Sequence, residues 1–359
     1  MAPKTRLLFT ICILICAWLL LSDNRSAASP EPPYRIFILH SYEAGHVCGQ
    51  PQHDGVISEV HRAGLKDQEN LQVQTYFMDT KRKNNTPELI REQARIALQK
   101  IRAFRPDVLI VLDDNAFRTV ALRLVDKPVP MVFSGMNNQL EAYHQKKACM
   151  ESRNRPGHNI TGVYEKLHFA DAIRVHTKLF PQTQKVMIFS DLSPTGQAIL
   201  RQVQVEMAQE PLPCAHEVRI VKSWEEYQKA IERANQDPEV GVIYPGALLL
   251  KDRQGNTYTA PEIFAWTVKY SHKPEIAINY AFTKMGLFGG AAVDFYAMGE
   301  QAGKMVVRIL RGEDPGEIPI QEARRYALVF NLDRARQLGL EIPSDVLMAA
   351  DEVVVNKRE

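Results

Sequence analysis

The sequence predicts an α/β protein with two doubly wound parallel-sheet lobes joined by a multi-strand hinge. Two observations favour this fold. The chain has 359 residues, which is longer than one hydrophobic core usually spans, and 45% of them are hydrophobic. Short runs rich in β-branched residues alternate with longer amphipathic runs, which is the pattern of βαβ units and a parallel sheet. Two lobes are therefore expected.

The first lobe is expected over residues 34–158, and part of 295–350 completes it. Its longest helix begins with Thr86 as N-cap and Pro87 at the first helical position, as helix starts prefer. A polar stretch over 137–158 has no periodicity and indicates a surface excursion before the crossover. The expected strands are 35–41, 72–77, 107–112 and 130–135, and the expected helices are 54–65, 87–104 and 115–124.

The second lobe is expected over residues 159–285 and repeats the alternation. The remaining segment, 286–359, is too short for a third lobe and needs an existing sheet to join, so it is predicted to cross the hinge back to the first lobe. The second lobe's strands are expected at 159–164, 185–190, 216–221, 240–245 and 275–279, and its helices at 169–179, 195–208, 224–235 and 261–270. The last segment's strands are expected at 286–294 and 327–330, and its helices at 296–310 and 332–338.

The N-terminus has the three parts of an export signal. Lys4 and Arg6 precede an apolar run over 7–21, and small residues follow at 26–28. The apolar run is shorter than the roughly 20 residues that span a bilayer, so a cleaved signal peptide over 1–28 is favoured over an uncleaved membrane anchor. The mature chain is expected to be periplasmic or otherwise extracytoplasmic.

Charge and cysteine content narrow the class further. Asp and Glu number 42, Lys and Arg number 44, and the basic residues are spread along the chain, which argues against a nucleic-acid partner. Three cysteines remain beyond the signal, and this odd count in an oxidising compartment suggests one disulfide and one free thiol. Cys48 and Cys149 are the preferred pair, because both lie in loops that should meet at one end of the same sheet, and Cys214 is left over.

Motifs along the mature chain resemble those of a known family. HSYEAGH (40–46) follows the first strand, VPMVFSGMN (129–137) ends the first lobe, and NITGVYE (159–165) opens the second. The most specific are FGGAAVDFYAMGEQAGKMVVRILRGEDPGEIPIQ (288–321) and FNLDRARQLGLEIPSDVL (330–347). In these motifs the chain is similar to the periplasmic substrate-binding proteins of ABC transporters whose characterised members bind tryptophan or tyrosine. These proteins have the type I periplasmic binding fold.

The resemblance implies a monomeric binding protein of an ABC-type uptake system, without enzymatic activity. It implies closure over a small ligand, an amino acid or a related small carboxylate, and delivery to a membrane permease. The HSY opening also resembles extracytoplasmic sensor domains of histidine kinases, so a periplasmic sensor that feeds a membrane signalling partner is the alternative. The stretch GHVCGQPQH (45–53) departs from the family pattern, which weakens the transfer of the aromatic preference.

Ligand contacts are expected beyond the carboxyl ends of the strands, where helix N-termini and loop amides converge in open α/β sheets. The residues at these ends are therefore the binding candidates. In the first lobe they are Ser41, Tyr42, Asp113, Asp114, Asn115, Ser134, Gly135 and Asn137. In the second lobe they are Tyr164, Asp191, Ser193, Thr195, Gly196, Pro245, Gly246, Asn279 and Tyr280, and Asp294 follows the Gly-rich strand.

Hydroxyl and carboxylate candidates have different expected roles. Ser193 and Thr195 open a helix, so they are candidates to bind a ligand carboxylate at the positive end of its dipole, with plain N-capping as the alternative. Asp113 and Asp114 are candidates for a ligand ammonium group in a low-dielectric cleft. The alternatives for this pair are helix capping and acid–base or Mg²⁺ chemistry, but no third carboxylate stands nearby in the sequence.

Asp294 and three tyrosines complete the candidates. Asp294 is assigned either ligand contact or the cap of the helix that follows it. Tyr42, Tyr164 and Tyr280 are candidates to sandwich an aromatic or apolar part of the ligand, with an ordinary place at the rim as the alternative.

Metal binding and catalysis are the rival classes. His40, His46, Cys48 and His53 are capable of binding zinc or copper, but their spacing fits no compact metal motif and Cys48 has a competing disulfide. We expect no metal and no cofactor. The chain has no G-x-S-x-G, no Walker sequence and no G-x-G-x-x-G after a strand, so no catalytic residue is predicted.

Overall fold

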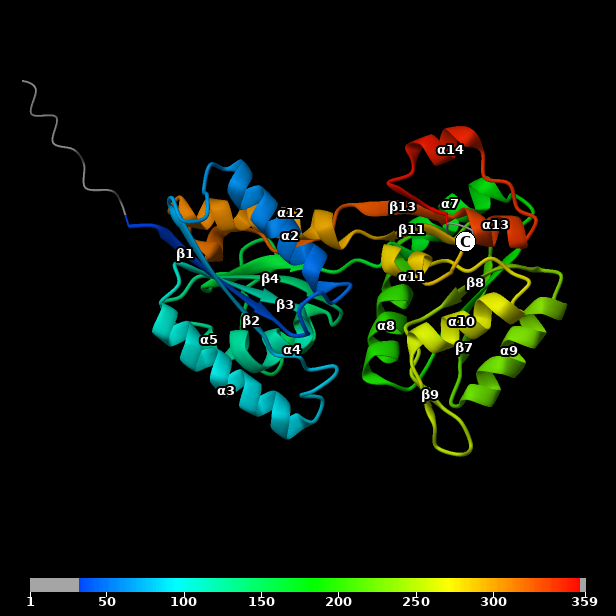
Figure 1. Ribbon diagram of the computed structural model, residues 1–359, viewed down its shortest axis with the longest axis horizontal. Coiled ribbons are helices and arrows are strands. Elements are labelled where there is room, and N and C mark those ends of the chain that lie inside the picture. The colour runs from blue at the N-terminus through cyan, green and yellow to red at the C-terminus, as the bar shows by residue number, and fades with distance from the viewer. Residues whose placement is uncertain (1–31, 356–359) are drawn as a thin grey trace, which may run out of the picture. The chain divides into compact units, whose positions relative to one another are not determined.

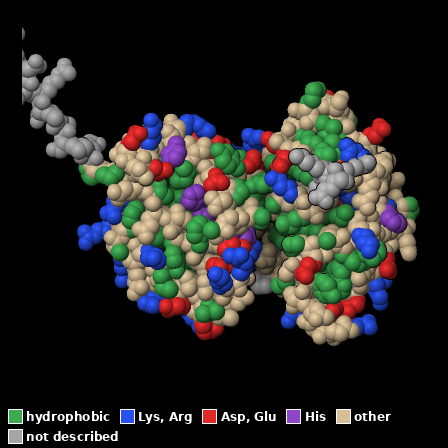
Figure 2. Space-filling view, in the orientation of Figure 1, with side chains coloured by type: hydrophobic (Ala, Val, Ile, Leu, Met, Phe, Trp, Pro, Cys, Tyr) green, Lys and Arg blue, Asp and Glu red, His purple; other side chains and the backbone are tan. Residues whose placement is uncertain are grey.

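The computed structural model describes residues 32–355, which contain two lobes, each with its own parallel sheet (Figure 1). The predicted fold class is confirmed. The predicted signal peptide lies outside the described residues. Within residues 32–355, no helix is both long enough and apolar enough to cross a membrane. Figure 2 shows acidic and basic side chains interspersed over one face, in keeping with their nearly equal numbers.

The first sheet has six parallel strands in the order β12-β5-β4-β3-β1-β2. Its central strands are continuous apolar runs because both faces of the sheet are covered. In β1, Ile36 and Ile38 face one core, and Phe37 and Leu39 face the other. The strands are β1 (Tyr34–His40), β2 (Leu71–Phe77), β3 (Val108–Leu112), β4 (Met131–Met136), β5 (Ile160–Tyr164) and β12 (Gln321–Glu322).

Helices cover both faces of this sheet. The helix after β1 begins at Gly49 instead of residue 54, because Pro51 is tolerated within a first turn. Thr86 caps the helix after β2 as predicted, with its hydroxyl accepting from the Leu89 amide at 3.4 Å. One face carries α2 (Gly49–Arg62) and α12 (Phe295–Leu310). The other carries α3 (Pro87–Phe104), α4 (Asp113–Ala116), a π-helical turn (Phe117–Ala121), α5 (Leu122–Leu124) and α6 (Leu140–His144).

Glycines allow α2 and α12 to cross closely. A Cβ atom on Gly55 of α2 would lie 2.2 Å from the Tyr296 carbonyl oxygen. A Cβ atom on Gly299 of α12 would lie 2.1 Å from the Gln52 carbonyl oxygen. Since no larger residue fits at this distance, the glycines of the C-terminal motif act in packing this helix against the first lobe.

The second sheet has three parallel strands in the order β7-β6-β8. The segment 275–279, which was expected to be a further strand, forms only isolated bridges. Glu275 bridges to Ile243 of this sheet, whereas Ile276 bridges to Gly289, so the segment divides its hydrogen bonds between two sheets. The elements are β6 (Lys185–Ser190), β7 (Ala215–Ile220), β8 (Val240–Pro245), α7 (Phe169–Leu179), α8 (Pro194–Gln209), α9 (Trp224–Gln236) and α10 (Ala260–Tyr270), with a short hairpin of β9 (Leu250–Lys251) and β10 (Thr257–Tyr258).

A third sheet, β11-β13-β14, is built from the C-terminal part of the chain. The chain passes between the lobes after β5, after β11 and after β12, so the hinge has several strands, as predicted. The strand β5 pairs with β4, so it belongs to the first sheet, and the chain enters the second lobe after Tyr164 and not at residue 159. The other predicted domain boundaries stay a prediction. The elements are β11 (Gly289–Val293), β13 (Tyr326–Asn331), β14 (Glu352–Val354), α11 (Tyr280–Lys284), α13 (Leu332–Gln337) and α14 (Ser344–Ala349).

A buried ion pair attaches α13 to the second lobe. The Arg334 guanidinium donates through Nε to Glu275 Oε2 at 3.0 Å and through Nη2 to Glu275 Oε1. It also donates to the carbonyl oxygens of Val268 and Ser271. Both charges are therefore matched in a region without solvent.

The predicted disulfide does not form. Cys48, Cys149 and Cys214 are free thiols. Cys48 packs against the core on the α2 face of the first sheet, and Cys149 belongs to the core on the opposite face. The sheet itself separates the two sulfur atoms.

Candidate ligand-binding site

Asp113 follows β3 and carries a buried carboxyl group. The residue is 2% exposed, and its Oδ2 atom has no hydrogen-bond partner among the described residues. Its φ of +67° lies in the left-handed region, where non-glycine residues are uncommon and are often functional. Burial raises the pKa of Asp113 to about 8; Lys81 opposes this shift and the charge of Asp114 adds to it. Asp113 therefore remains the strongest of the predicted candidates.

Glu165 is a second buried carboxyl group, which was not among the predicted candidates. It follows β5, and only β4 separates that strand from β3. The residue is 4% exposed, and no hydrogen bond reaches its carboxyl group within residues 32–355. Burial, followed by the charges of Asp113 and Asp114, holds its pKa well above the usual range. The one signal in the sequence was its position directly after the strand of NITGVYE.

Three more buried polar atoms around Asp113 lack partners in the described part of the chain. They are His40 Nδ1, Gln52 Oε1 and Ser134 Oγ, from β1, α2 and β4. A Cβ atom on Gly49 would lie 3.2 Å from His40 Nδ1 and 3.7 Å from Asp113 Oδ2, so these two atoms border the same space. Buried polar groups are normally hydrogen-bonded, so this group is a candidate to contact a ligand or ordered water.

Tyr42 and Lys81 lie beside the two carboxyl groups. The Lys81 ammonium is 4.2 Å from the centroid of the Tyr42 ring and 3.5 Å from His46 Nε2. Burial and the nearby charge of Asp113 raise the pKa of Tyr42, so its hydroxyl stays protonated and able to donate. The Lys81 ammonium group therefore stacks on the Tyr42 ring and makes no ion pair with Asp113 or Glu165.

Other predicted residues of the first lobe hold loops in place. Asp114 accepts hydrogen bonds from the amides of Asn137 and Asn138 and from the Tyr143 hydroxyl. These bonds occupy its oxygens, which favours the structural alternative for this residue. Ser41 bonds to the Leu112 carbonyl and the Ala116 amide, and Asn115 bonds to Thr80 and Arg118.

The polar residues after β6 are satisfied within the second lobe. Asp191 Oδ1 accepts from the Ser193 amide at 2.9 Å and from the Ser193 hydroxyl at 2.6 Å. Asp191 Oδ2 accepts from the Leu249 amide at 2.6 Å. The Ser193 hydroxyl caps α8 by accepting from the Gly196 amide at 3.0 Å. The contacts of Ser193 therefore favour the role of N-cap, which was the alternative to ligand binding.

Asn279 and Asp294 are also N-caps. Asn279 accepts from the Phe282 amide at 3.2 Å, and Asp294 accepts from the Ala297 amide at 2.9 Å. Asp294 has Arg325 at 3.6 Å, and burial raises its pKa. The side-chain oxygens of both residues therefore cap helices.

The remaining predicted residues offer few free polar atoms. Gly135 has a φ of +75° and lies against the Gln52 side chain. Thr195 is exposed in the first turn of α8. Pro245 ends β8, the Gly246 amide donates to the Phe189 carbonyl, and Tyr280 lies near the Phe295 ring.

The two lobes touch between α8 and the loop after β4. The Gln202 side chain donates to the Asn137 carbonyl oxygen, and Arg201 donates to Asn138 Oδ1 at 3.3 Å. A cavity of about 190 Å³ lies at this boundary. Its lining includes Gln139, Arg153, Tyr164, Glu165, Lys166, Gln202, Glu206 and Glu322. Glu165 is thus the carboxyl group of the site that borders open space between the lobes.

The histidines of the first loop do not assemble into a metal centre. His40 Nε2 and His53 Nδ1 are 3.0 Å apart and hydrogen-bond to each other. Burial lowers the pKa of both His40 and His46 to about 3. Across residues 32–355, no group of three or more His, Cys, Asp and Glu side chains is placed to hold a metal ion.

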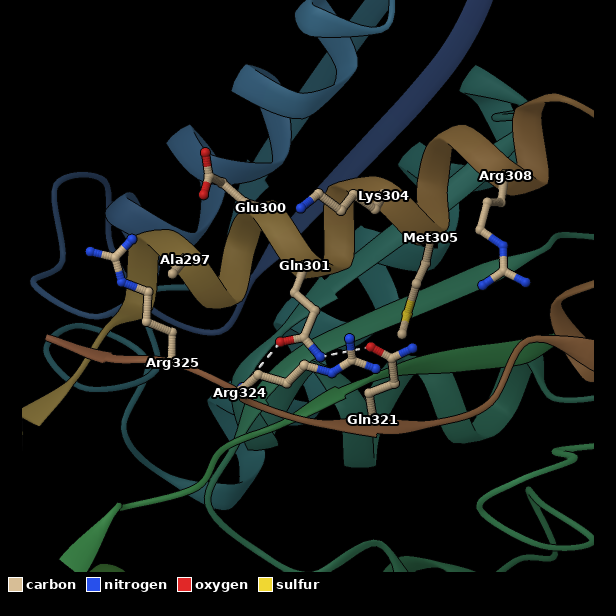
Figure 3. Close-up of a pocket in the computed structure, with 9 residues that line it drawn as sticks. All are labelled: Ala297, Glu300, Gln301, Lys304, Met305, Arg308, Gln321, Arg324 and Arg325. Carbon is tan, nitrogen blue, oxygen red and sulfur yellow. Dashed lines mark hydrogen bonds between the residues drawn. The ribbon is translucent and has the colours of Figure 1, made fainter. Parts of the chain in front are cut away.

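A second groove, of about 440 Å³, lies along α12 and carries several basic side chains (Figure 3). Gln301 stands at its centre and ties α12 to the crossing segment, with its Nε2 donating to Gln321 Oε1 at 2.8 Å and its Oε1 accepting from the Arg324 amide at 3.2 Å. Arg308 and Arg325 are already paired, with Glu313, Asp294 and Asp351. Two of the basic side chains in this groove are therefore already matched by acidic partners.

The comparisons with known proteins agree with this architecture. Residues 48–354 match the family of ABC transporter substrate binding proteins. The chain belongs to this family, whose members bind substrates outside the cytoplasm. The resemblance seen in the sequence motifs is confirmed.

Individual relatives are distant. A tyrosine-binding protein from Clostridioides difficile (strain R20291) is 18% identical over 289 residues, which cover 80% of this chain and 76% of that protein. An ABC domain in complex with L-Trp from Streptococcus pneumonia has 18% identity and a TM-score of 0.65, over 90% of this chain and 100% of that one. A ligand-free, open substrate-binding protein with adhesive properties from Clostridium difficile has 15% identity and a TM-score of 0.68, with the same coverage. These structures share the fold.

Proposed function

We propose that this protein is the extracytoplasmic binding component of an ABC uptake system and that it closes over a small ligand that carries an ammonium group, such as an amino acid. The observation that carries the proposal is the pair of buried carboxyl groups at strand ends, Asp113 and Glu165, to which no cation is hydrogen-bonded in the described chain. A cationic group of the ligand supplies the missing charge. Tyr42 and the free atoms of His40 and Ser134 lie around it as further contacts.

The second lobe contributes apolar surface to the proposed site. Leu192 and Leu249 are 56% and 51% exposed, and they follow β6 and β8. Asp191 holds the two loops together through the Leu249 amide. An amphipathic ligand with its ammonium group toward the first lobe and an apolar side chain toward these leucines fits both surfaces. The tyrosine and L-Trp named for two relatives have this chemistry.

The proposed mechanism is closure by differential affinity. A ligand that touches both lobes binds the closed state more tightly, so it shifts the hinge equilibrium toward closure. Arg201 and Gln202 of α8 already contact the loop after β4, so the two lobes meet on this side of the hinge. A membrane permease then recognises the closed form of a monomeric binding protein, which has no catalytic role.

Calorimetry with an amino acid and its truncated analogues tests the proposal. The panel contains L-tyrosine, L-tryptophan and L-leucine, together with tyramine, which lacks the carboxylate, and 3-(4-hydroxyphenyl)propionate, which lacks the amine. We expect binding of at least one amino acid, and residual binding of the amine but not of the acid. Binding of the acid alone, or no binding across the panel, contradicts the proposal.

A further inference from the structure

Asp113 and Glu165 are both buried and follow strands of the same sheet. The parallel strands that precede them are separated by one strand, β4, which corresponds to a spacing of roughly 10 Å between their backbones. Near the end of β4, which lies between these two strands, Gly135 has no side chain and the Gln52 side chain packs against it. The charge of Asp113 is one of the causes that raise the pKa of Glu165, so ionisation of one buried carboxyl group opposes ionisation of the other.

The charged and titratable neighbours do not neutralise the pair. From α4 the Asp114 carboxylate adds negative charge, and its own hydrogen bonds go to backbone amides and Tyr143. From the loop before α3, Lys81 is the cation whose charge reaches both groups, and it is held over the Tyr42 ring. Two further cations, Arg153 and Lys166, line the same cavity as Glu165, but each already has an acidic partner. Arg153 pairs with Glu141 at 2.7 Å, and Lys166 lies 3.8 Å from Glu322 and 3.9 Å from Glu210. The remaining groups around the pair are neutral or acidic: His40 of β1, Tyr42 and Cys48 of the first loop, Gln52 of α2, and Tyr244 and Glu206 of the second lobe.

We propose that Asp113 and Glu165 act as a coupled carboxyl pair, which holds a proton while the site is empty and releases it when a ligand ammonium group enters. The inference rests on the proposed function. In this step the O–H bond of one carboxylic acid breaks and its proton goes to solvent. The resulting carboxylate pairs with an ammonium group that is already protonated, so no other bond and no electron changes place.

Proton release couples binding to pH. The empty site favours the protonated pair, and the occupied site favours the ionised pair, so raising the pH favours binding until the empty pair is itself ionised. The pKa of Asp113, raised to about 8 by burial, sets the upper end of that window. At lower pH the release of this proton into solution costs more free energy, so binding weakens.

The first arm of the test is titration calorimetry with L-tyrosine at pH 7, in phosphate, HEPES and Tris, whose ionisation enthalpies differ. The slope of apparent binding enthalpy against ionisation enthalpy gives the number of protons exchanged. We expect the release of about one proton per L-tyrosine bound. Glu59→Gln is the matched control, because Glu59 is a buried glutamate of the same lobe that is paired with Arg62, and it should leave the slope unchanged. L-tyrosine binding without any slope overturns the inference and leaves the proposed function intact.

The second arm needs no ligand. The unfolding midpoint in urea is measured from pH 5 to pH 8 for the wild type and for Asp113→Asn with Glu165→Gln. Between these limits the wild-type native state holds protons that the unfolded chain has lost, so its stability should fall with rising pH relative to the variant. Parallel curves overturn the inference. If no amino acid of the panel binds, the proposed function fails, while this arm still decides whether the pair holds a proton; if the double variant does not fold, the single variant Glu165→Gln replaces it.

Discussion

Two buried glutamates, one in each lobe, meet opposite surroundings. Glu275 is fully buried, and the Arg334 guanidinium matches its charge with two hydrogen bonds. Glu165 is almost as deeply buried, but the charges nearest to it are two aspartates and the Lys81 ammonium, which stacks on a ring. The difference teaches that burial of a charged group does not by itself indicate a binding site. A buried charged group that has no partner within the chain does indicate one, because the missing partner has to come from outside the chain.

The largest expected effect comes from exchanging each glutamate for glutamine. Glu275→Gln leaves the Arg334 guanidinium buried without its counter-charge, which should cost about 3 to 5 kcal/mol of the free energy of unfolding. Glu165→Gln removes an uncompensated acid and should leave stability unchanged or higher. Urea denaturation at pH 7 measures both variants. Equal losses in the two would break the comparison.

Ligand affinity should change in the opposite order. Glu165→Gln removes a charge-assisted contact with the ligand ammonium group, and we expect L-tyrosine to bind about 10- to 100-fold more weakly. Asp113→Asn should act in the same direction. Calorimetry at pH 7 measures both, with Glu59→Gln as the variant that retains wild-type affinity. An unchanged affinity in Glu165→Gln would place the ligand elsewhere.

The pH dependence sharpens the comparison further. Burial raises the pKa of Asp113 to about 8, so the empty site is protonated near neutral pH and the affinity for L-tyrosine should rise between pH 6 and pH 8. The increase should be at most about tenfold per pH unit and should level off above that window. Affinities measured at half-unit steps test this. A wild-type profile as flat as that of Asp113→Asn with Glu165→Gln contradicts it.

The smallest effect is expected in the second lobe. Ser193→Ala removes the cap of α8 and should cost about 1 kcal/mol of stability. Because the Ser193 hydroxyl is already bonded to Asp191 and to the Gly196 amide, the affinity for L-tyrosine should stay at the wild-type value. Thermal unfolding and calorimetry on the same preparation separate the two effects. A large loss of affinity would indicate that Ser193 contacts the ligand.

The sequence predicted most strands and helices because their apolar periodicity is local. It also placed Asp113 directly after a buried strand, where the structure has it. It did not separate Asp113 from Asp191, since both are carboxylates that follow a buried strand, and only the three-dimensional contacts show that Asp191 is fully hydrogen-bonded. Glu165 was missed for the same reason: a single glutamate after a strand carries no sign of its missing partner. The predicted bond between Cys48 and Cys149 failed because sequence does not tell on which face of a sheet a loop packs.

The crossing of α2 and α12 has a consequence for the order of assembly. The helix α2, which carries Gln52 toward Asp113, is packed against a helix that the ribosome makes almost 250 residues later, with Gly299 against the Gln52 backbone. The first lobe therefore cannot complete its core during synthesis of its own residues and has to wait for the C-terminal part of the chain. Such long-range closure slows folding. A chain whose first lobe stays incomplete until late keeps its N-terminal half unfolded for most of its synthesis.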